Sequence, residues 1–322
     1  MKKILISIAL LLGVSFNPAA AIELDASPTM QALSDRLVEQ GIYTRDELQA
    51  LLGPIEIDEG VLKLFKRQAE AKPWHEYRNI FLKQDRISAG KKFMRENQDL
   101  LQAVYDQYGV PPHIVTALIG VETFYGTRMG SRSVLRSLAT LTAAYPRREE
   151  FFGKELETFL KILKSERLVA ADVEGSYAGA VGIPQFMPTS YVAYAVDFNG
   201  NGKRDLVHEL DDAAGSVANY LVEHGWKREA PIALWIDQPV NGQARELVAK
   251  RAKPTHSVLT MRQNGISLNE SDDTLVSLNR LEETSGMRYF VGYANFYALT
   301  RYNPSNKYAM AIVELAEAIQ DN

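Results

Sequence analysis

The stretch PPHIVTALIGVETFYG, Pro111–Gly126, combines a strong helix signal with one residue that this signal does not explain. Two prolines suit the first turn of a helix, and a glycine such as Gly126 suits the residue just beyond its end. Ile114, Leu118 and Glu122 recur at every fourth position, so Glu122 falls on the same face as the apolar residues. The pattern predicts a buried helix that carries one carboxyl group toward the core.

Two interpretations of Glu122 are open at this point. A carboxyl group removed from water resists ionisation, and one that stays protonated near neutral pH can act as a general acid. The alternative is a partly buried glutamate that pairs with Arg128 or Arg132, because buried charges are usually paired.

The first residues, MKKILISIALLLGVSFNPAAA, have the features of a secretory signal. Two lysines precede an apolar run from Ile4 to Val14, and small residues follow it. The run is shorter than the roughly 20 residues that span a bilayer. We expect residues 1–21 to be a signal peptide that is cleaved after Ala21, and no later segment predicts a transmembrane helix.

Composition excludes several other classes of protein. The 322 residues, 46% hydrophobic and 24% charged, are enough for one to three globular domains. With 36 basic and 40 acidic residues the chain has no excess of positive charge suited to nucleic acid. Its five histidines lack zinc-ligand spacing, and without cysteine it has neither disulfides nor an N-terminal cysteine to lipidate.

The order of patterns predicts a mainly α fold of the α+β class. Helical periodicity runs from Met30 to about Ala103 and returns in 113–125, 147–164 and 212–224. Short β-branched runs between turn signals then predict a small β-rich module over residues 230–292. These runs are IALWI, HSVLTM, ISL and TLVSLNRL, and the helical pattern resumes with YAMAIVELAEAI.

The segment GSYAGAVGIPQFMPTSY, Gly175–Tyr191, is rich in small residues and carries single polar groups. Small residues allow a ligand to approach the backbone, and scattered hydroxyl, amide and aromatic groups suit a sugar better than a phosphate. A plain turn between two helices is the alternative. No Asp or Glu lies between Gly175 and Val196. The second carboxylate that hydrolytic glycosidases normally use is therefore not evident.

The next segment, DFNGNGKRD, matches the opening of an EF-hand calcium loop. The twelfth position holds His208 in place of the usual glutamate, so the loop is not of standard length. A turn without metal is the alternative. We expect a structural calcium ion, with these ligands: Asp197, Asn199, Asn201, the carbonyl of Lys203, and Asp211, which would close the loop.

Several segments, taken together and in this order, resemble the lytic murein transglycosylase B family of bacteria. They are PPHIVTALIGVETFYG, ATLTAAYPRREEFF, GSYAGAVGIPQFMPTSY, VDFNGNGKRDL, GSVANYLVEHGW and NFYALTRYNPSNKYAMAI. The resemblance implies a lysozyme-like helical core with a helical domain and a small β-rich module. It places them at 22–103 (helical domain), 104–229 (catalytic core, with an EF-hand-like loop at 197–211), 230–292 (β-rich module) and 293–322 (a segment that returns to the core).

The resemblance also implies the reaction. Such enzymes cleave the MurNAc-β-1,4-GlcNAc bond of peptidoglycan and form a 1,6-anhydromuramoyl end, with one glutamate as acid and then base, and no cofactor for the chemistry. By motif match Glu122 is that residue, and Ser176 would contact the N-acetyl group or the intermediate. The remaining residues implied as substrate contacts are Gln185, Phe186 and Tyr302, more weakly Tyr77, Asn219 and Tyr220, and Arg147 and Arg148 for stem-peptide carboxylates. Each weaker match could instead serve core packing or a surface ion pair.

The expected protein is thus a soluble periplasmic member of that family. Its partners would be peptidoglycan glycan strands and possible complexes for cell-wall synthesis or turnover. A lysozyme-type muramidase, and a non-catalytic, calcium-stabilised peptidoglycan-binding protein, are the competing hypotheses.

Overall fold

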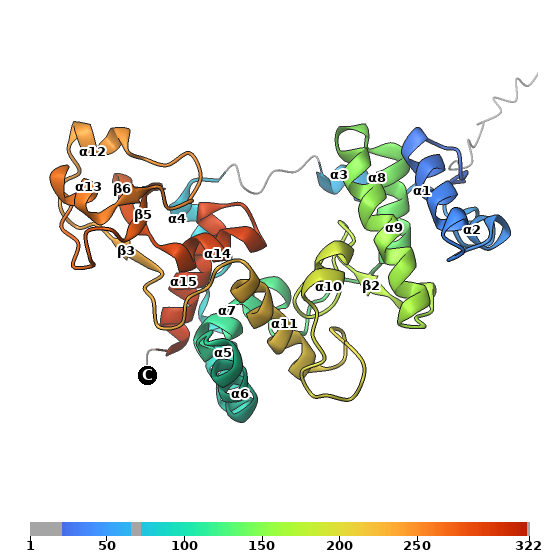
Figure 1. Ribbon diagram of the computed structural model, residues 1–322, viewed down its shortest axis with the longest axis horizontal. Helices are drawn as coiled ribbons and strands as arrows, with labels where there is room; N and C mark the ends of the chain where they lie inside the picture. Colours follow the sequence, from blue (N-terminus) through green and yellow to red (C-terminus); the bar gives the residue numbers. More distant parts are fainter. Residues whose placement is uncertain (1–20, 66–71, 321–322) are drawn as a thin grey trace, which may run out of the picture.

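The computed structural model describes residues 21–65 and 72–320, and it is mainly helical with two small antiparallel sheets, as expected (Figure 1). The predicted signal peptide lies outside the described residues, apart from Ala21. Within the described ranges, no helix has the length and apolar character that crossing a membrane requires.

One lobe, which we call the α8–α9 lobe, combines two separate parts of the chain (Figure 1, right). The long helix α9, in the second part, contributes the buried residues Phe152, Leu156 and Phe159 to the shared core. Leu33 and Leu37 of α1 pack into this core from the first part. The elements are α1 (Pro28–Glu39), α2 (Arg45–Leu52), α3 (Glu59–Phe65), β1 (Arg132–Ser133), α8 (Val134–Ala144), η3 (Pro146–Arg148), α9 (Glu149–Ser165), η4 (Ala170–Asp172) and β2 (Glu174–Gly175).

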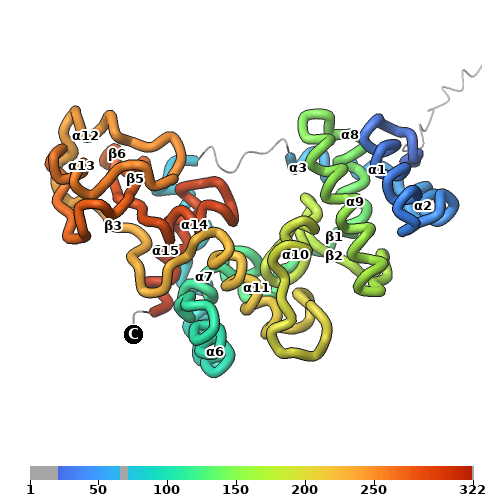
Figure 2. The backbone as a smooth tube through the Cα atoms, viewed as in Figure 1, coloured from blue at the N-terminus to red at the C-terminus, as the bar shows by residue number. Residues whose placement is uncertain are grey.

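A central body surrounds α7 and shares a second, larger core. Helix α7 packs against α5, α6, α11 and α15, so segments far apart in the sequence meet there (Figure 2). Its elements are α4 (Trp74–Tyr77), η2 (Arg78–Ile80), α5 (Gln84–Glu96), α6 (Gln98–Tyr108), α7 (Pro112–Thr123), α10 (Pro188–Tyr194), α11 (Leu210–Glu223), α14 (Ala294–Tyr302) and α15 (Asn306–Gln320).

The third unit is a small β-rich module with its own apolar cluster. Its antiparallel sheet has the order β3-β6-β5-β4. The elements are β3 (Ala233–Trp235), α12 (Gly242–Glu246), β4 (His256–Ser257), α13 (Val258–Gln263), β5 (Leu275–Glu283) and β6 (Gly286–Gly292).

Two of the predicted strand runs are wrong. HSVLTM contributes only the two-residue β4, because Ser257 caps a helix there by accepting a hydrogen bond from the Thr260 N–H at 3.1 Å. ISL forms no strand. Strand β6, which the sequence analysis did not predict, pairs with β5 along seven residue pairs, from Ser277↔Gly292 to Glu283↔Gly286.

The apolar clusters divide the chain differently from the expected domain boundaries. Residues 22–61 share a core with α8 and α9, whereas α4 to α7 belong to the central body. Apolar surface on α8 and α9 explains this grouping, because α1 contacts both helices and α3 contacts α8. The continuous segments 22–103 and 104–229 therefore do not each enclose a separate core.

Candidate active site

Glu122 lies in the last turn of α7, a helix whose residues 114–120 are all buried. The helix ends at Thr123, and the next two residues, Phe124 and Tyr125, take the left-handed conformation. Non-glycine residues rarely adopt it, and its cost must be offset by surrounding contacts. The Thr123 hydroxyl provides one such contact, since it donates to the carbonyl of Ile183 at 2.9 Å and accepts from the Gly126 N–H at 3.0 Å.

The partner of Glu122 is Tyr308, whose hydroxyl donates a short hydrogen bond to Oε1 of the carboxyl group. Tyr308 lies on α15 and is buried. Neither arginine of the ion-pair interpretation is used: Arg132 pairs with Asp58 at 2.8 Å, and the Arg128 guanidinium lies over the Phe124 ring.

Burial raises the pKa of Glu122 to about 7, and the hydrogen bond from Tyr308 acts in the opposite direction. No other carboxylate contributes to that pKa among the described residues. The group can therefore hold a proton near neutral pH and release it without a second carboxylate nearby.

Arg86 of α5 contacts the end of α7. Its guanidinium donates to the carbonyl of Gly120 and lies over the rings of Phe81 and Phe124. The hydroxyl of Tyr125 donates back to the Arg86 carbonyl at 2.8 Å. Helices α5 and α7 are thus linked immediately before and after Glu122.

The glycine-rich segment 175–187 lies against the end of α7. The Gln185 amide donates to the carbonyls of Met129 and Gly182, at 3.0 and 2.9 Å, and Gln185 is itself left-handed. The hydroxyl oxygen of Ser176 accepts from the N–H groups of Ala178 and Ala180. Gln185 therefore lies beside the segment that follows Glu122, and the Ser176 oxygen organises its own turn.

Aromatic side chains form a continuous group beside Glu122. The ring of Phe186 is 5.6 Å from that of Tyr220 and 5.8 Å from that of Tyr302, and the two tyrosine rings are 4.8 Å apart. The Tyr302 hydroxyl donates to the Pro184 carbonyl at 2.6 Å. Burial, and after it the negative charge of Glu122, raise the pKa of Tyr302 well above its usual range.

The weaker matches occupy three different places. Tyr77 is buried and close enough to Tyr308 to raise the pKa of that hydroxyl slightly, behind the larger effects of burial and Glu122. Asn219 donates to the Tyr194 carbonyl at 3.0 Å, which links α11 to α10. Arg147 and Arg148 are exposed on η3 of the α8–α9 lobe, where Arg148 lies 4.0 Å above the Phe151 ring.

The EF-hand-like loop is folded around Asp197, whose carboxylate accepts the N–H groups of Asn201 and Gly202 at 3.0 and 2.7 Å. The side-chain amides of Asn199 and Asn201 both donate to the carboxylate of Glu209, at 2.6 to 3.0 Å. No group of three or more His, Cys, Asp or Glu residues suited to a metal occurs in the described part of the chain. The oxygens of Asp197, the two asparagines and Glu209 are nevertheless a donor set of the kind that calcium prefers.

Two of these residues were not identified from the sequence. Tyr308 is within the segment NKYAMAI, but its helical spacing with Ile312 and Leu315 predicts only a core residue. Glu209 is one position beyond the EF-hand pattern, so the motif gives no signal for it.

This chain is similar over most of its length to proteins of one family. The Transglycosylase SLT domain family matches residues 25–317. The membrane-bound lytic murein transglycosylase B of Escherichia coli is 38% identical over 305 residues, covering 91% of this chain and 83% of that protein.

Two solved structures are also similar. The lytic transglycosylase Slt35 of Escherichia coli, in complex with calcium, has a TM-score of 0.82 at 37% identity, covering 92% of this chain and 94% of that one. SltB3 of Pseudomonas aeruginosa, in complex with NAG-anhNAM-pentapeptide, has a TM-score of 0.78 at 30% identity, covering 91% and 80%. The likeness to Slt35 confirms the lysozyme-like fold class. The chain therefore belongs to the family of lytic murein transglycosylases that carry the Transglycosylase SLT domain.

Proposed function

We propose that this enzyme is a peptidoglycan lytic transglycosylase that cleaves the MurNAc-β-1,4-GlcNAc bond with Glu122 as its only acid and base. The observation that carries this proposal is the partly buried carboxyl of Glu122, whose pKa is raised by burial to about 7 while no second carboxylate contributes to it among the described residues. A relative of this chain, SltB3, was solved with an anhydromuramoyl product, which supports the same reaction here.

In the first step the protonated Glu122 gives its proton to the glycosidic oxygen, and the bond between that oxygen and C1 of MurNAc breaks. In the second step the C6 hydroxyl oxygen of the same sugar bonds to C1, and the Glu122 carboxylate takes the hydroxyl proton. The acid is regenerated, and no water is consumed. Intramolecular attack is favoured because the hydroxyl is already held beside C1.

The neighbouring residues bind and orient the sugars. The Ser176 hydroxyl and the carbonyl of the Gln185 amide supply neutral polar contacts. Tyr302 is partly exposed and supplies apolar surface for a sugar ring. The buried rings of Phe186 and Tyr220 pack against it and hold it in place. Tyr77 is buried next to Tyr308 and supports the site from the side of α15. Asn219 supports it from α11, and Arg147 and Arg148 contact carboxylates of the stem peptide from the α8–α9 lobe.

Digestion of purified cell-wall sacculi, followed by mass analysis of the products, tests the proposal. We expect muropeptides with 1,6-anhydromuramic ends, which lack the mass of one water relative to hydrolysis products. Glu122→Gln should abolish their release without loss of fold, because the amide keeps the shape and has no transferable proton.

The exposed Glu223 offers a matched control, and Glu223→Gln should retain full activity. Reducing ends from the wild-type protein would instead identify a muramidase. Binding to sacculi without any cleavage would identify a non-catalytic peptidoglycan-binding protein. An active, folded Glu122→Gln variant would remove Glu122 from the mechanism.

For the loop 197–211 we propose a structural calcium site, held by Asp197, Asn199, Asn201, the Lys203 carbonyl and a closing carboxylate, Asp211 or Glu209. The calcium complex of Slt35 supports it, as does the oxygen-rich donor set. The ion takes no part in the chemistry.

Because an ion that binds only the folded state stabilises it, millimolar calcium should raise the melting temperature by on the order of 5 °C relative to chelator. Asp197→Ala should remove the difference, and Asp211→Asn and Glu209→Gln show which carboxylate closes the loop. Equal melting temperatures of the wild-type protein in calcium and in chelator would contradict the site.

We further propose that the mature enzyme acts in the periplasm, exported by residues 1–21, with glycan strands as its substrate and with cell-wall synthesis or turnover complexes as candidate partners. The charge and apolar pattern of that segment and the family's substrate support this location.

A further inference from the structure

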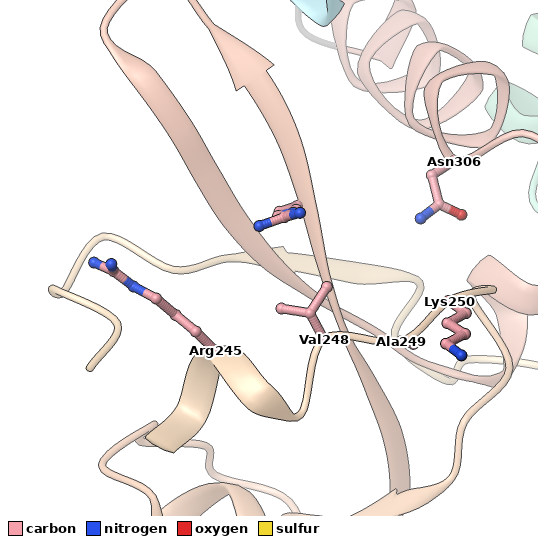
Figure 3. A pocket seen from close by; sticks show the side chains of 6 residues that line it. Arg245, Val248, Ala249, Lys250 and Asn306 are labelled. Carbon is pink, nitrogen blue, oxygen red and sulfur yellow. The ribbon is translucent and has the colours of Figure 1, made fainter. Parts of the chain in front are cut away.

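A cavity of about 420 Å³ lies between the β-rich module and the start of α15, outside the group of residues around Glu122. Its lining consists of Arg245, Val248, Ala249, Lys250, Arg280 and Asn306. Figure 3 shows side chains from α12, from the loop after it and from the first residue of α15, and Arg280 of β5 completes the lining. The loop is fixed at its base, because the Ala249 N–H donates to the Leu278 carbonyl of β5 at 2.8 Å.

The cavity is positively charged and has no acidic lining residue. Arg245, Lys250 and Arg280 form no ion pair with any acidic residue of the described ranges 21–65 and 72–320. Arg245 donates one N–H to the Val240 carbonyl at 3.0 Å, which fixes its side chain. Its other N–H groups can donate to a ligand. Three exposed cations without ion-pair partners, in a chain of net charge -4, favour an anionic ligand.

Helix α15 adds to this preference. Its first residue, Asn306, lines the cavity, and the unpaired N–H groups of a helix's first turn carry partial positive charge. The Asn306 amide is held in place by donating to Asn279 at 3.1 Å. Guanidinium groups, an ammonium group and a helix N-terminus together match carboxylates spread along a peptide.

The position of the cavity relates it to the reaction. Asn306 precedes Tyr308 by two residues, which is about 3 Å along a helix axis, and Tyr308 donates to Glu122. A ligand in the cavity is therefore close to the end of α15 that completes the site. The part of a peptidoglycan strand that bears negative charge next to the cleaved bond is the peptide on MurNAc.

We propose that this basic cavity is a subsite for the carboxylates of the glycan-borne peptide, separate from Arg147 and Arg148 on the other lobe. The inference rests on the proposed function, because it names the part of that substrate which the cavity binds. Peptide-bearing strands then bind more tightly than bare glycan because their carboxylates replace water on three cations.

Calorimetry with two soluble probes tests the subsite: the GlcNAc-MurNAc disaccharide carrying a pentapeptide, and the same disaccharide without peptide. The triple variant Arg245→Gln, Lys250→Gln, Arg280→Gln should raise the Kd of the peptide-bearing probe by about tenfold, as expected for losing charge-assisted hydrogen bonds. The Kd of the bare disaccharide should not change. The wild-type preference should shrink as salt is added.

The matched control removes the same three charges elsewhere, with Lys92→Gln, Arg95→Gln and Lys227→Gln, all at exposed positions. It should leave both Kd values as in the wild type. The subsite is refuted if the triple variant binds the peptide-bearing probe as tightly as the control does, or if it weakens both probes equally. Failure of the proposed function is a separate result, namely that the wild-type protein releases no anhydromuramoyl product from sacculi.

Discussion

Burial favours the protonated form of Glu122, and the folded protein loses stability when the group ionises. A carboxyl whose pKa is higher in the folded than in the unfolded state binds more protons when folded. Its contribution to stability is complete at acid pH and is lost as the pH rises from the unfolded value near 4.5 through the folded value of about 7. The raised pKa of Glu122 therefore lowers the free energy of unfolding above neutral pH.

Glu122→Gln should accordingly be more stable than the wild-type protein at pH 8, by about 1–3 kcal/mol, because the amide cannot ionise. At pH 4 the two proteins should be nearly equal. Denaturant unfolding at both pH values measures the difference. A gain of the same size at both pH values would show that ionisation of Glu122 is not its cause.

In the proposed mechanism, Tyr308 sets the pH range in which Glu122 acts as the acid. Its hydrogen bond lowers the pKa that burial has raised, so in Tyr308→Phe the pKa of Glu122 should rise above about 7. Since the acid must be protonated, activity is present below that pKa, and the alkaline limb of the pH–rate profile should move to higher pH. Tyr302→Phe is the control, because that hydroxyl donates to Pro184. A limb that stays in place in Tyr308→Phe would contradict the role of Tyr308.

The sequence could predict Glu122 because its neighbours at every fourth position are apolar, and α7 has the predicted burial at Ile114 and Leu118. It could not predict Tyr308 as the partner. The two residues are 186 positions apart, and nothing in a local pattern reports which helices will meet.

At the scale of elements, the glycines of 175–187 allow the chain to pass where side chains would not fit. A Cβ on Gly175 would lie 2.1 Å from the carbonyl oxygen of Ala180, which is backbone and cannot move away cheaply. The same glycine pairs with Arg132 in the β1–β2 sheet. The turn of Ser176 and the link to α7 therefore depend on this one position.

Gly175→Ala should lower the free energy of unfolding by about 1–3 kcal/mol through overpacking, and should reduce kcat because the turn of Ser176 moves. Gly242→Ala is the control, because a Cβ there meets nothing within 4 Å. Thermal melts and sacculus digestion of both variants provide the measurements. A Gly175→Ala variant as stable and active as the control would contradict the close approach.

The ends of helices and strands can be predicted from the sequence where a single residue type, such as a glycine after a helix, determines them. Helix α11 ends at Glu223, one residue before the predicted end at 224, and the left-handed Gly225 follows it. The β-branched residues of HSVLTM predict a strand, but the Ser257 cap starts helix α13 there instead. Strand β6 was missed because its residues GMRYFVG become a strand only by pairing with β5.

At the scale of the whole molecule, the chain alternates between the α8–α9 lobe and the central body. It builds part of the α8–α9 lobe, crosses to the central body, returns through α8 and α9, and crosses again (Figure 2). Apolar periodicity predicts each helix, but it does not predict whether the helix packs in the core of the α8–α9 lobe or in that of the central body. Local sequence therefore predicted the helices better than their grouping.

Glu122 and Tyr308 come from α7 and α15, on opposite sides of the crossing into the β-rich module. A ribosome delivers the chain in order, so Glu122 emerges 186 residues before the hydroxyl that adjusts its pKa. During that interval α7 also lacks the apolar face of α15 that covers it. A wall-cleaving enzyme built in this order stays incomplete while its chain is being made, and it acquires its working form only after nearly all of the sequence up to Tyr308 has been delivered.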